Sequence, residues 1–282
     1  METKSTKKKV LKKSTKKKVK KPSPSSKFQK KILKDKSLNL KETSSEGPFA
    51  KDLSILIPTR GRLGEFSACL DSLAVSKVGK ATVIVVVDDD SDSEKIVFEK
   101  EKLFKNFKSF FSSKRLYSVG TYNQALLECQ TDLFCWVSNL VTFPDKYWIE
   151  RMVREFIEFF PDQVGVMSLR NGNGAAFGIS SKKFVEYNGG WFHPGYKIQY
   201  CDVELTHRAI FLGKYAWPKG DLIYHNREAK SEIPAMDPGK RYEMIREDKK
   251  LYIERRLRKF DLPKDKIKFP GHDCLSFISV VK

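Results

Sequence analysis

The segment Thr82–Asp92, with the sequence TVIVVVDDDSD, constrains the fold of this chain more than any other. Its first six residues are β-branched and almost wholly apolar, which is typical of a strand covered on both faces. The carboxylates of Asp88, Asp89 and Asp90 follow at once. Ligands of open α/β sheets bind at the carboxyl ends of the strands, so this acidic run stands where a binding site is expected. The alternative is a solvated turn, because aspartate is a common turn former.

Apolar runs and helical spacings alternate along the chain up to residue 225. A strand over 51–57, a helix over 63–75 and a strand over 82–87 predict a right-handed βαβ unit. The same patterns predict later strands at 116–119, 133–137, 164–169, 175–179 and 221–225. They predict further helices at 94–111, after Gly120-Thr121, and at 144–160, 202–212 and 237–260. This alternation is typical of an α/β fold with a mostly parallel sheet.

The first 41 residues contain 17 lysines and two acids, so they carry +15 of the formal net charge of +19. We expect residues 1–47 to be a disordered lysine-rich tail, because they cannot bury enough apolar surface to offset the entropy of ordering. Such a tail is attracted to polyanions, either DNA or an anionic membrane or envelope surface. A tail that only solubilises or localises the protein is the alternative. The small remaining charge gives no indication of a nucleic-acid-binding fold.

The cysteines and the apolar runs bear on where the protein works. The five cysteines form no CxxC pair and their number is odd, which favours reduced, buried thiols in a cytoplasmic protein. No apolar run approaches the roughly 20 residues that span a bilayer. The sequence therefore predicts no transmembrane segment, and membrane contact would be peripheral.

Five motifs follow one another between residues 52 and 226: ILIPTRGR, VVVDDDSD, YNQALLECQTDLFCWV, FPDKYWIERMV, and NGGW with CDVELTHRAIFLG. In this order and spacing they resemble the family-2 glycosyltransferases. The resemblance implies the GT-A fold of nucleotide-diphospho-sugar transferases, a mostly parallel sheet flanked by helices. It assigns 48–230 to that domain and leaves 231–282 as a C-terminal helical extension. The implied activity is transfer of a sugar, with inversion, from a nucleoside diphosphate donor (UDP or another) to an acceptor hydroxyl.

The resemblance also implies a role for individual residues. The donor nucleotide would be bound by Pro58, Thr59, Arg60, Asp88, Asp89 and Asn139. The acceptor side would lie at Gly190, Trp191 and Glu204. Asp202 would be the general base that takes the acceptor proton, a task that a pKa raised by burial would suit. A helix N-cap is the alternative role for Asp202, and ordinary packing is the alternative for Trp191.

The chain departs from the family where a DxD-like acidic motif is expected, because that position reads Ser138-Asn139-Leu140. Mg²⁺ and Mn²⁺ prefer carboxylate oxygen, so a metal on the donor diphosphate would lack its usual ligand. Asn139 and His225 could still hold a metal weakly, or Arg208, Lys219 or Arg227 could steady the leaving group instead. The alternative functions are a degenerate, binding-only glycosyltransferase and, ranked last, a nucleotidyltransferase, which would need a Gly-rich GxGTR-type loop.

Overall fold

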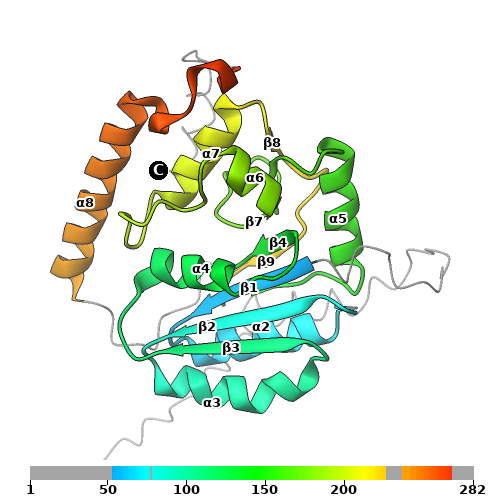
Figure 1. Cartoon of the computed structure of the whole chain (residues 1–282). Coiled ribbons are helices and arrows are strands. Elements are labelled where there is room, and N and C mark those ends of the chain that lie inside the picture. The colour runs from blue at the N-terminus through cyan, green and yellow to red at the C-terminus, as the bar shows by residue number, and fades with distance from the viewer. Residues whose placement is uncertain (1–52, 77, 227–236, 269–282) are drawn as a thin grey trace, which may run out of the picture. The chain divides into compact units, whose positions relative to one another are not determined.

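The computed structural model describes residues 53–76, 78–226 and 237–268, so the predictions for the tail, Arg227 and Cys274 lie outside the described residues. A seven-stranded sheet in the order β3-β2-β1-β4-β7-β6-β8 forms its centre (Figure 1). The strands are β1 (Leu53–Thr59), β2 (Thr82–Asp88), β3 (Phe107–Ser112), β4 (Leu133–Trp136), β6 (Val166–Ser168), β7 (Gly178–Ser181) and β8 (Tyr215–Ala216). A separate antiparallel pair joins β5 (Val141–Thr142) to β9 (Tyr224–His225).

Strand direction divides the sheet into two parts. Strands β3, β2, β1 and β4 are parallel, and β7 joins β4 and β6 in antiparallel pairs. Strand β8 is parallel to β6. In the parallel part Thr59 pairs with Val87, so the carboxyl ends of β1 and β2 lie side by side. The predicted α/β fold with a mostly parallel sheet is confirmed.

Helices cover both faces of this sheet (Figure 1). One face packs against α2 (Leu63–Ala74), α3 (Ser91–Lys100) and α5 (Trp148–Phe159). The other carries α4 (Tyr117–Leu127), α6 (Lys182–Tyr187), α7 (Cys201–Phe211) and α8 (Pro238–Leu257). Since side chains alternate along a strand, Ile55 and Ile57 enter the first core layer whereas Leu56 enters the second. Short 3₁₀ turns form η2 (Glu101–Leu103), η3 (Lys259–Asp261) and η4 (Lys264–Lys266).

Helix α5 shows how local pattern and fold agree. Its buried residues Ile149, Met152, Val153 and Phe156 recur at helical spacing and face the core. The helix ends at Phe159, before Pro161, as a proline requires. It begins at Trp148, four residues later than the spacing after Pro144 predicts.

The predicted helix over 94–111 is confirmed only as far as Lys100, and the predicted strand over 116–119 is wrong. Helix α3 ends at Lys100, and Phe107–Ser112 pairs with β2 as the parallel edge strand β3. The chain then enters α4 at Tyr117. Partners 24 residues away in sequence decide this strand, because β-propensity depends on cross-strand packing that local spacing does not contain. Three short elements, β5, α6 and β8, also have no counterpart in the prediction.

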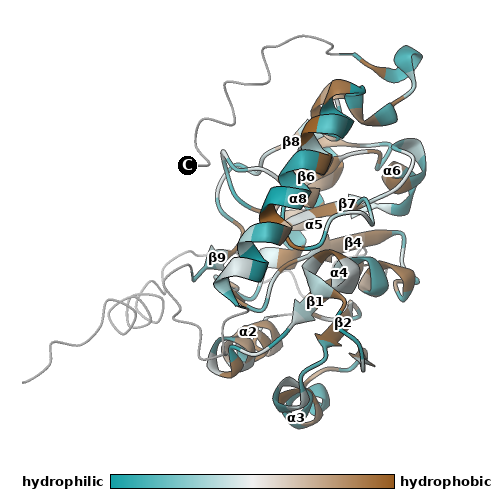
Figure 2. Ribbon diagram, turned by 90° about the vertical axis from the view of Figure 1, so that its left-hand side faces the viewer, coloured by the Kyte–Doolittle hydropathy of each residue, from teal (hydrophilic) through white to brown (hydrophobic). Residues whose placement is uncertain are grey.

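The described part of the C-terminal extension packs on the rest of the molecule. Tyr252 of α8 and Phe260 of η3 are buried in the second core layer, while hydrophilic residues cover most of the helix (Figure 2). Cys69, Cys129, Cys135 and Cys201 are buried free thiols, as predicted. Within the described ranges, no helix has both the length and the apolar character needed to cross a bilayer.

Candidate active site

The turn after β1 is fixed by side chains from two neighbouring segments. The amide of Asn139 donates to Thr59 Oγ1 at 3.0 Å and to the Gly61 carbonyl at 3.2 Å. Gly61 has a φ of 55° and its own N–H donates to Asp90 Oδ2 at 2.5 Å. These bonds hold Arg60, between Thr59 and Gly61, at the carboxyl end of the sheet. Pro58 precedes them within β1.

Asp88 ends β2 and is only 3% exposed. Its carboxylate forms an ion pair with Arg115 and accepts the Leu116 N–H at 2.6 Å. The Arg115 guanidinium also stacks over the Tyr117 ring, 5.1 Å from its centroid. The fold therefore ties the predicted nucleotide-binding Asp88 to the start of α4.

The next two carboxylates of the acidic run have different surroundings. Asp89 is exposed and has a φ of 51°, so its side chain is free to meet a ligand. Asp90 precedes α3 and bonds to both Gly61 and Ser93. Burial alone would raise the pKa of Asp90, but these hydrogen bonds hold it below its ordinary value. Asp90 thus joins the β1 turn to α3.

Two guanidinium groups stand close together beside these acids. The Arg115 pKa is lowered mainly by burial, and the positive charge of Arg60 adds to that effect although Asp88 opposes it. The Arg60 Nε is buried without a hydrogen-bond partner. An anionic ligand at this strand end would relieve both the repulsion between the two cations and the cost of the unpartnered donor.

Asp202 lies in the first turn of α7, after Tyr200, whose φ is 66°. Among the described residues, no basic side chain forms an ion pair with it. Burial raises the pKa of Asp202 above its ordinary value, and the backbone amides of Val203 and of Asp202 itself only partly offset this. A carboxylate with a raised pKa and no cationic partner is suited to accept a proton.

Tyr122 of α4 is a neighbour of this carboxylate. Its hydroxyl donates to the Val137 carbonyl, just after β4, at 3.2 Å. Burial raises the pKa of Tyr122, and the nearby Cys201 and Asp202 add to the rise. Asp202 therefore lies near Tyr122, whose hydroxyl bonds to the segment that leads from β4 to Asn139.

Asp248 of α8 anchors the loop that leads to Asp202. It is 1% exposed, and its carboxylate accepts the N–H groups of Lys197, Ile198 and Gln199, each at 2.9 Å. Hydrogen bonds to a charged acceptor are stronger than neutral ones. The C-terminal helix thus sets the path of the chain into α7.

Among the described residues, the hydrogen-bond partners of the predicted acceptor-side residues do not include Asp202. The Gly190 and Trp191 carbonyls accept hydrogen bonds from Arg208, and the Trp191 ring stacks on Phe192 at 4.3 Å inside the core. The Glu204 carboxylate is 1% exposed and takes donors from Arg255, Arg208 and Tyr196. The Trp191 ring is packed in the core, which is the alternative role considered for it. The Glu204 carboxylate links α7 to α8.

The loop that lacks the acidic motif offers few metal ligands. The Asn139 side-chain nitrogen donates within the β1 turn, and His225 pairs with Val141 between β9 and β5, its ring against Phe177 at 4.9 Å. Across the described ranges, no three His, Cys, Asp or Glu side chains converge on one point. These residues do not fit a carboxylate-held metal.

Arg115 and Asp248 were not found by sequence reasoning. Arg115 follows the misread strand β3, and reading that strand correctly would have placed the residue at the same sheet edge as Asp88. Asp248 lies among the charges of α8, where no local signal separates it from exposed acids. Only its contacts with 197–199 distinguish it.

The sequence model described as "Glycosyl transferase family 2" matches residues 54–216. The chain belongs to glycosyl transferase family 2. The matched range contains the predicted nucleotide-binding residues, acceptor-side residues and base, whereas Lys219, His225 and Arg227 lie beyond it. The fold is that of the GT-A glycosyltransferases. A sequence comparison with curated proteins gives no match.

Solved glycosyltransferase structures share the fold of this family-2 chain. S. aureus TarS 1-349 is 17% identical, with a TM-score of 0.51 over 62% of this chain and 60% of that one. Its complex with UDP-GlcNAc is also 17% identical, with a TM-score of 0.53 over 70% of this chain and 65% of that one. Mannosyltransferase PcManGT from Pyrobaculum calidifontis, in complex with GDP-Man and Mn²⁺, is 15% identical. Its TM-score is 0.50 over 61% of this chain and 55% of that one. The chain thus spans less than two thirds of the length of each structure.

Proposed function

We propose that the protein transfers a sugar, with inversion, from a nucleoside diphosphate donor to an acceptor hydroxyl, with Asp202 as general base. The observation that carries the proposal is the surroundings of the Asp202 carboxylate inside a family-2 fold. It is a carboxylate at the start of a helix, with its pKa raised by burial and without a basic ion-pair partner among the described residues. In its ionised form it would take the proton of the acceptor hydroxyl as that oxygen attacks the anomeric carbon.

The donor would bind at the carboxyl ends of β1 and β2. The exposed Asp89 can accept hydrogen bonds from the base or ribose. Arg60 and Arg115 would supply positive charge, and the unpartnered Arg60 Nε offers a donor that the protein itself does not use. Pro58, Thr59 and Asn139 would shape this pocket, since Asn139 bonds to Thr59. The related structures hold UDP-GlcNAc and GDP-Man, which supports a nucleotide sugar as donor.

Charge on the leaving diphosphate would be stabilised by the two arginines at this edge. The described residues do not fit a metal held by carboxylates, so no step of the proposal runs through one. His225 as a metal ligand, and Gly190, Trp191 and Glu204 as acceptor-side residues, stay predictions.

The decisive experiment compares Asp202→Asn with the wild type in a transfer assay and in a donor-binding titration. Removing a general base lowers the rate by about 10²–10⁴-fold, and donor affinity should change little. Asp132→Asn is the matched control, because Asp132 is exposed before the amino end of β4, at the opposite sheet edge. Near-normal turnover of Asp202→Asn would exclude the assignment of the base.

A binding-only protein is the second candidate, favoured by the loop at Ser138-Asn139-Leu140. It predicts donor binding with neither transfer nor hydrolysis. A screen of UDP- and GDP-sugars for thermal stabilisation, with and without Mn²⁺, followed by detection of released nucleoside diphosphate, distinguishes the two. Acceptor-dependent release would exclude this candidate.

The lysine-rich tail, residues 1–47, would tether the protein to a polyanion in the cytoplasm or at a membrane surface. The proposal rests on the 17 lysines among its first 41 residues. Counterion release predicts steep loss of DNA affinity with salt. Unchanged DNA affinity at low salt after deletion of residues 1–41 would contradict a DNA tether.

A further inference from the structure

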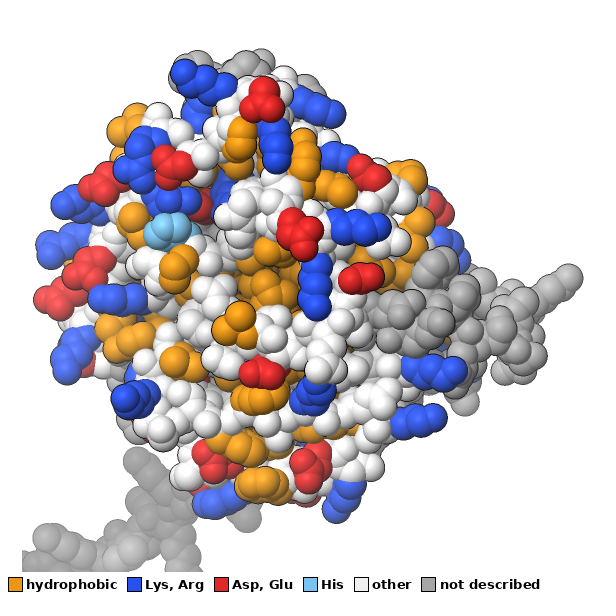
Figure 3. Space-filling view, in the orientation of Figure 1, with side chains coloured by type: hydrophobic (Ala, Val, Ile, Leu, Met, Phe, Trp, Pro, Cys, Tyr) orange, Lys and Arg blue, Asp and Glu red, His pale blue; other side chains and the backbone are white. Residues whose placement is uncertain are grey.

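The acidic side chains of α8 differ sharply in burial. Glu243, Glu247 and Glu254 are exposed, and acidic and basic side chains lie together on the surface over this helix, at the left of Figure 3. Asp248 is 1% exposed. A carboxylate can be buried only where the protein supplies hydrogen-bond donors to it. The partners of Asp248 therefore show what this helix holds.

Those partners are three consecutive N–H groups of the loop before α7. The N–H of Lys197 donates to Asp248 Oδ1, and those of Ile198 and Gln199 donate to Oδ2, each at 2.9 Å. Successive N–H groups aimed at one anion bind it strongly, because each bond is to a charged acceptor. The Lys197 carbonyl in turn accepts the Val119 N–H of α4 at 3.1 Å. The loop is thus held between α4 and α8.

Tyr200, the next residue, has a strained backbone. Its φ of 66° lies in the left-handed region, which a residue other than glycine keeps only where surrounding contacts hold it. The Tyr200 ring stacks on Tyr252 of α8, with the ring centroids 5.4 Å apart. The Tyr200 carbonyl accepts the Glu204 N–H at 2.8 Å, which is in the first turn of α7. Contacts with α8 therefore surround the residue at which the chain turns into α7.

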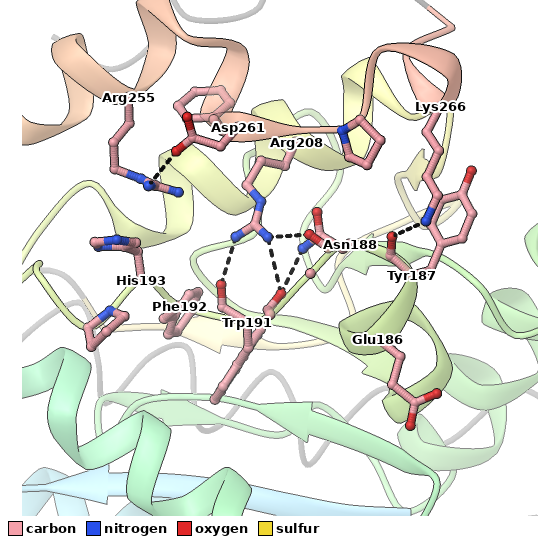
Figure 4. Close-up of a pocket in the computed structure, with 15 residues that line it drawn as sticks. Glu186, Tyr187, Asn188, Trp191, Phe192, His193, Arg208, Arg255, Asp261 and Lys266 are labelled. Carbon is pink, nitrogen blue, oxygen red and sulfur yellow. Dashed lines mark hydrogen bonds and ion pairs between the residues drawn. The ribbon is translucent and has the colours of Figure 1, made fainter.

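A second attachment to α8 follows Asp202. Arg255 donates to both oxygens of the Glu204 carboxylate, at 2.8 Å and 2.9 Å, and pairs with Asp261 at 3.2 Å (Figure 4). Asp202 lies between the two attachments, three residues after Gln199 and two before Glu204. Its side chain is partly exposed, so a substrate can reach it. Helix α8 thus holds the chain on both sides of the proposed base.

The position of a general base bears directly on the rate. Such a base must lie within hydrogen-bond reach of the proton that it takes. A displacement of about 1 Å, even one that begins far from the reacting atoms, can lower the rate about 10²-fold. The attachments come from a helix beyond residues 54–216, the range that matches the family model. This chain therefore fixes the start of α7 with a part of its own.

We propose that Asp248 is a positioning residue for Asp202. By holding residues 197–199 it sets the backbone at Tyr200, and through it the direction in which the Asp202 carboxylate points. The inference rests on the proposed function, in which Asp202 is the base. The proposed donor site lies at the carboxyl ends of β1 and β2. Loss of Asp248 should therefore slow proton transfer and leave donor binding nearly unchanged.

The test compares Asp248→Asn with the wild type in the full chain. Turnover is followed as release of nucleoside diphosphate from the UDP- or GDP-sugar that stabilises the protein most. We expect kcat to fall about 10–100-fold, with the donor KM within about twofold. Hydrogen exchange at the amides of 197–199 should become faster, because an asparagine offers these N–H groups no anion. Asp248→Glu, which keeps the anion but moves its oxygens by one methylene group, serves if Asp248→Asn does not fold.

Glu247→Gln is the matched control. Glu247 is adjacent to Asp248 and pairs with the same loop, but through the exposed Lys197 side chain at 2.9 Å. The control should leave kcat, the donor KM and amide exchange unchanged. Equal losses of kcat in the two variants would overturn the positioning role.

A double variant separates positioning from general loss of structure. In the Asp202→Asn background, adding Asp248→Asn should change the residual rate less than about twofold, because the two residues act as a unit. A merely structural role would lower the rate by the same factor in both backgrounds, which would overturn the proposal. A kcat of Asp248→Asn within about twofold of the wild type, or a loss confined to the donor KM, would also overturn it.

Failure of this inference and failure of the proposed function give different results. Near-normal turnover of Asp202→Asn excludes the base itself, and its positioning by Asp248 with it. An inactive Asp202→Asn beside a fully active Asp248→Asn excludes only the positioning role.

Discussion

The two acidic segments of the site, Asp88–Asp90 and the pair Asp202 and Glu204, differ in how the fold treats their carboxylates. In the first, Asp88 and Asp90 are bonded to other parts of the framework and only Asp89 is exposed. In the second, Glu204 has buried cationic partners, whereas Asp202, two residues earlier, has none among the described residues. Acids that look alike in sequence thus become structural or chemical according to whether the fold supplies a partner.

The largest expected effect is a loss of stability when the carboxylate with the most cationic partners, that of Glu204, is neutralised. Glu204→Gln should destabilise the protein by about 3–5 kcal/mol, because it removes the buried anion that Arg208 and Arg255 share and leaves Arg255 only the exposed Asp261. Glu254→Gln is the control, since its 4.0 Å pair with Lys250 is exposed and should contribute no more than about 1 kcal/mol. Chemical denaturation measures both. Equal losses in the two variants would show that Glu204 is not the link between α7 and α8.

A comparison within the first segment sharpens the distinction. Asp88→Asn should cost about 1.5–3 kcal/mol, as expected for hydrogen bonds to a charged group. Asp89→Asn should stay within about 0.5 kcal/mol, because its side chain is exposed. For donor affinity the order should reverse. Asp89→Asn should lose more donor affinity, relative to its loss of stability, than Asp88→Asn does. Calorimetric titration with UDP or GDP, beside thermal unfolding, tests both statements.

The second segment predicts a pH dependence. Asp202 must be ionised to accept a proton, and burial places its pKa above the ordinary 3.8. As pH falls through that raised pKa, kcat/KM should fall tenfold per pH unit below it. Asp132→Asn should keep the same profile. An activity that stays flat down to pH 4 would contradict a raised pKa at the base.

The smallest expected effect is the change in protein stability when Asp202 itself is replaced. Because the folded-state pKa lies above the unfolded value, the folded protein binds more protons between the two, and stability falls as pH rises through that window. At neutral pH, Asp202→Asn should therefore have a Tm equal to or above that of the wild type, where 1 kcal/mol corresponds to about 2–4 °C. The gain should vanish below the unfolded pKa. A clear loss of Tm at neutral pH would mean that the carboxylate is structural.

Much of the framework could be predicted from the sequence. The strand before Asp88 and the stripe of α5 are local patterns, and the first strand lies where predicted although it continues through Pro58 to Thr59. Strand β3 could not be predicted in the same way, because an edge strand of mixed Phe and Lys has no clear period of its own. That error also hid Arg115, the partner of Asp88.

The sequence by itself determined the α/β alternation, the order of the motifs and the position of Asp202 at a helix start, since these depend on neighbours within a few turns or one strand. Only the tertiary structure decided which carboxylates are paired. Asp88 meets Arg115 across 27 residues and Glu204 meets Arg255 across 51. Charge pairing depends on distance in space and on burial, and neither is contained in the spacing of residues along a chain.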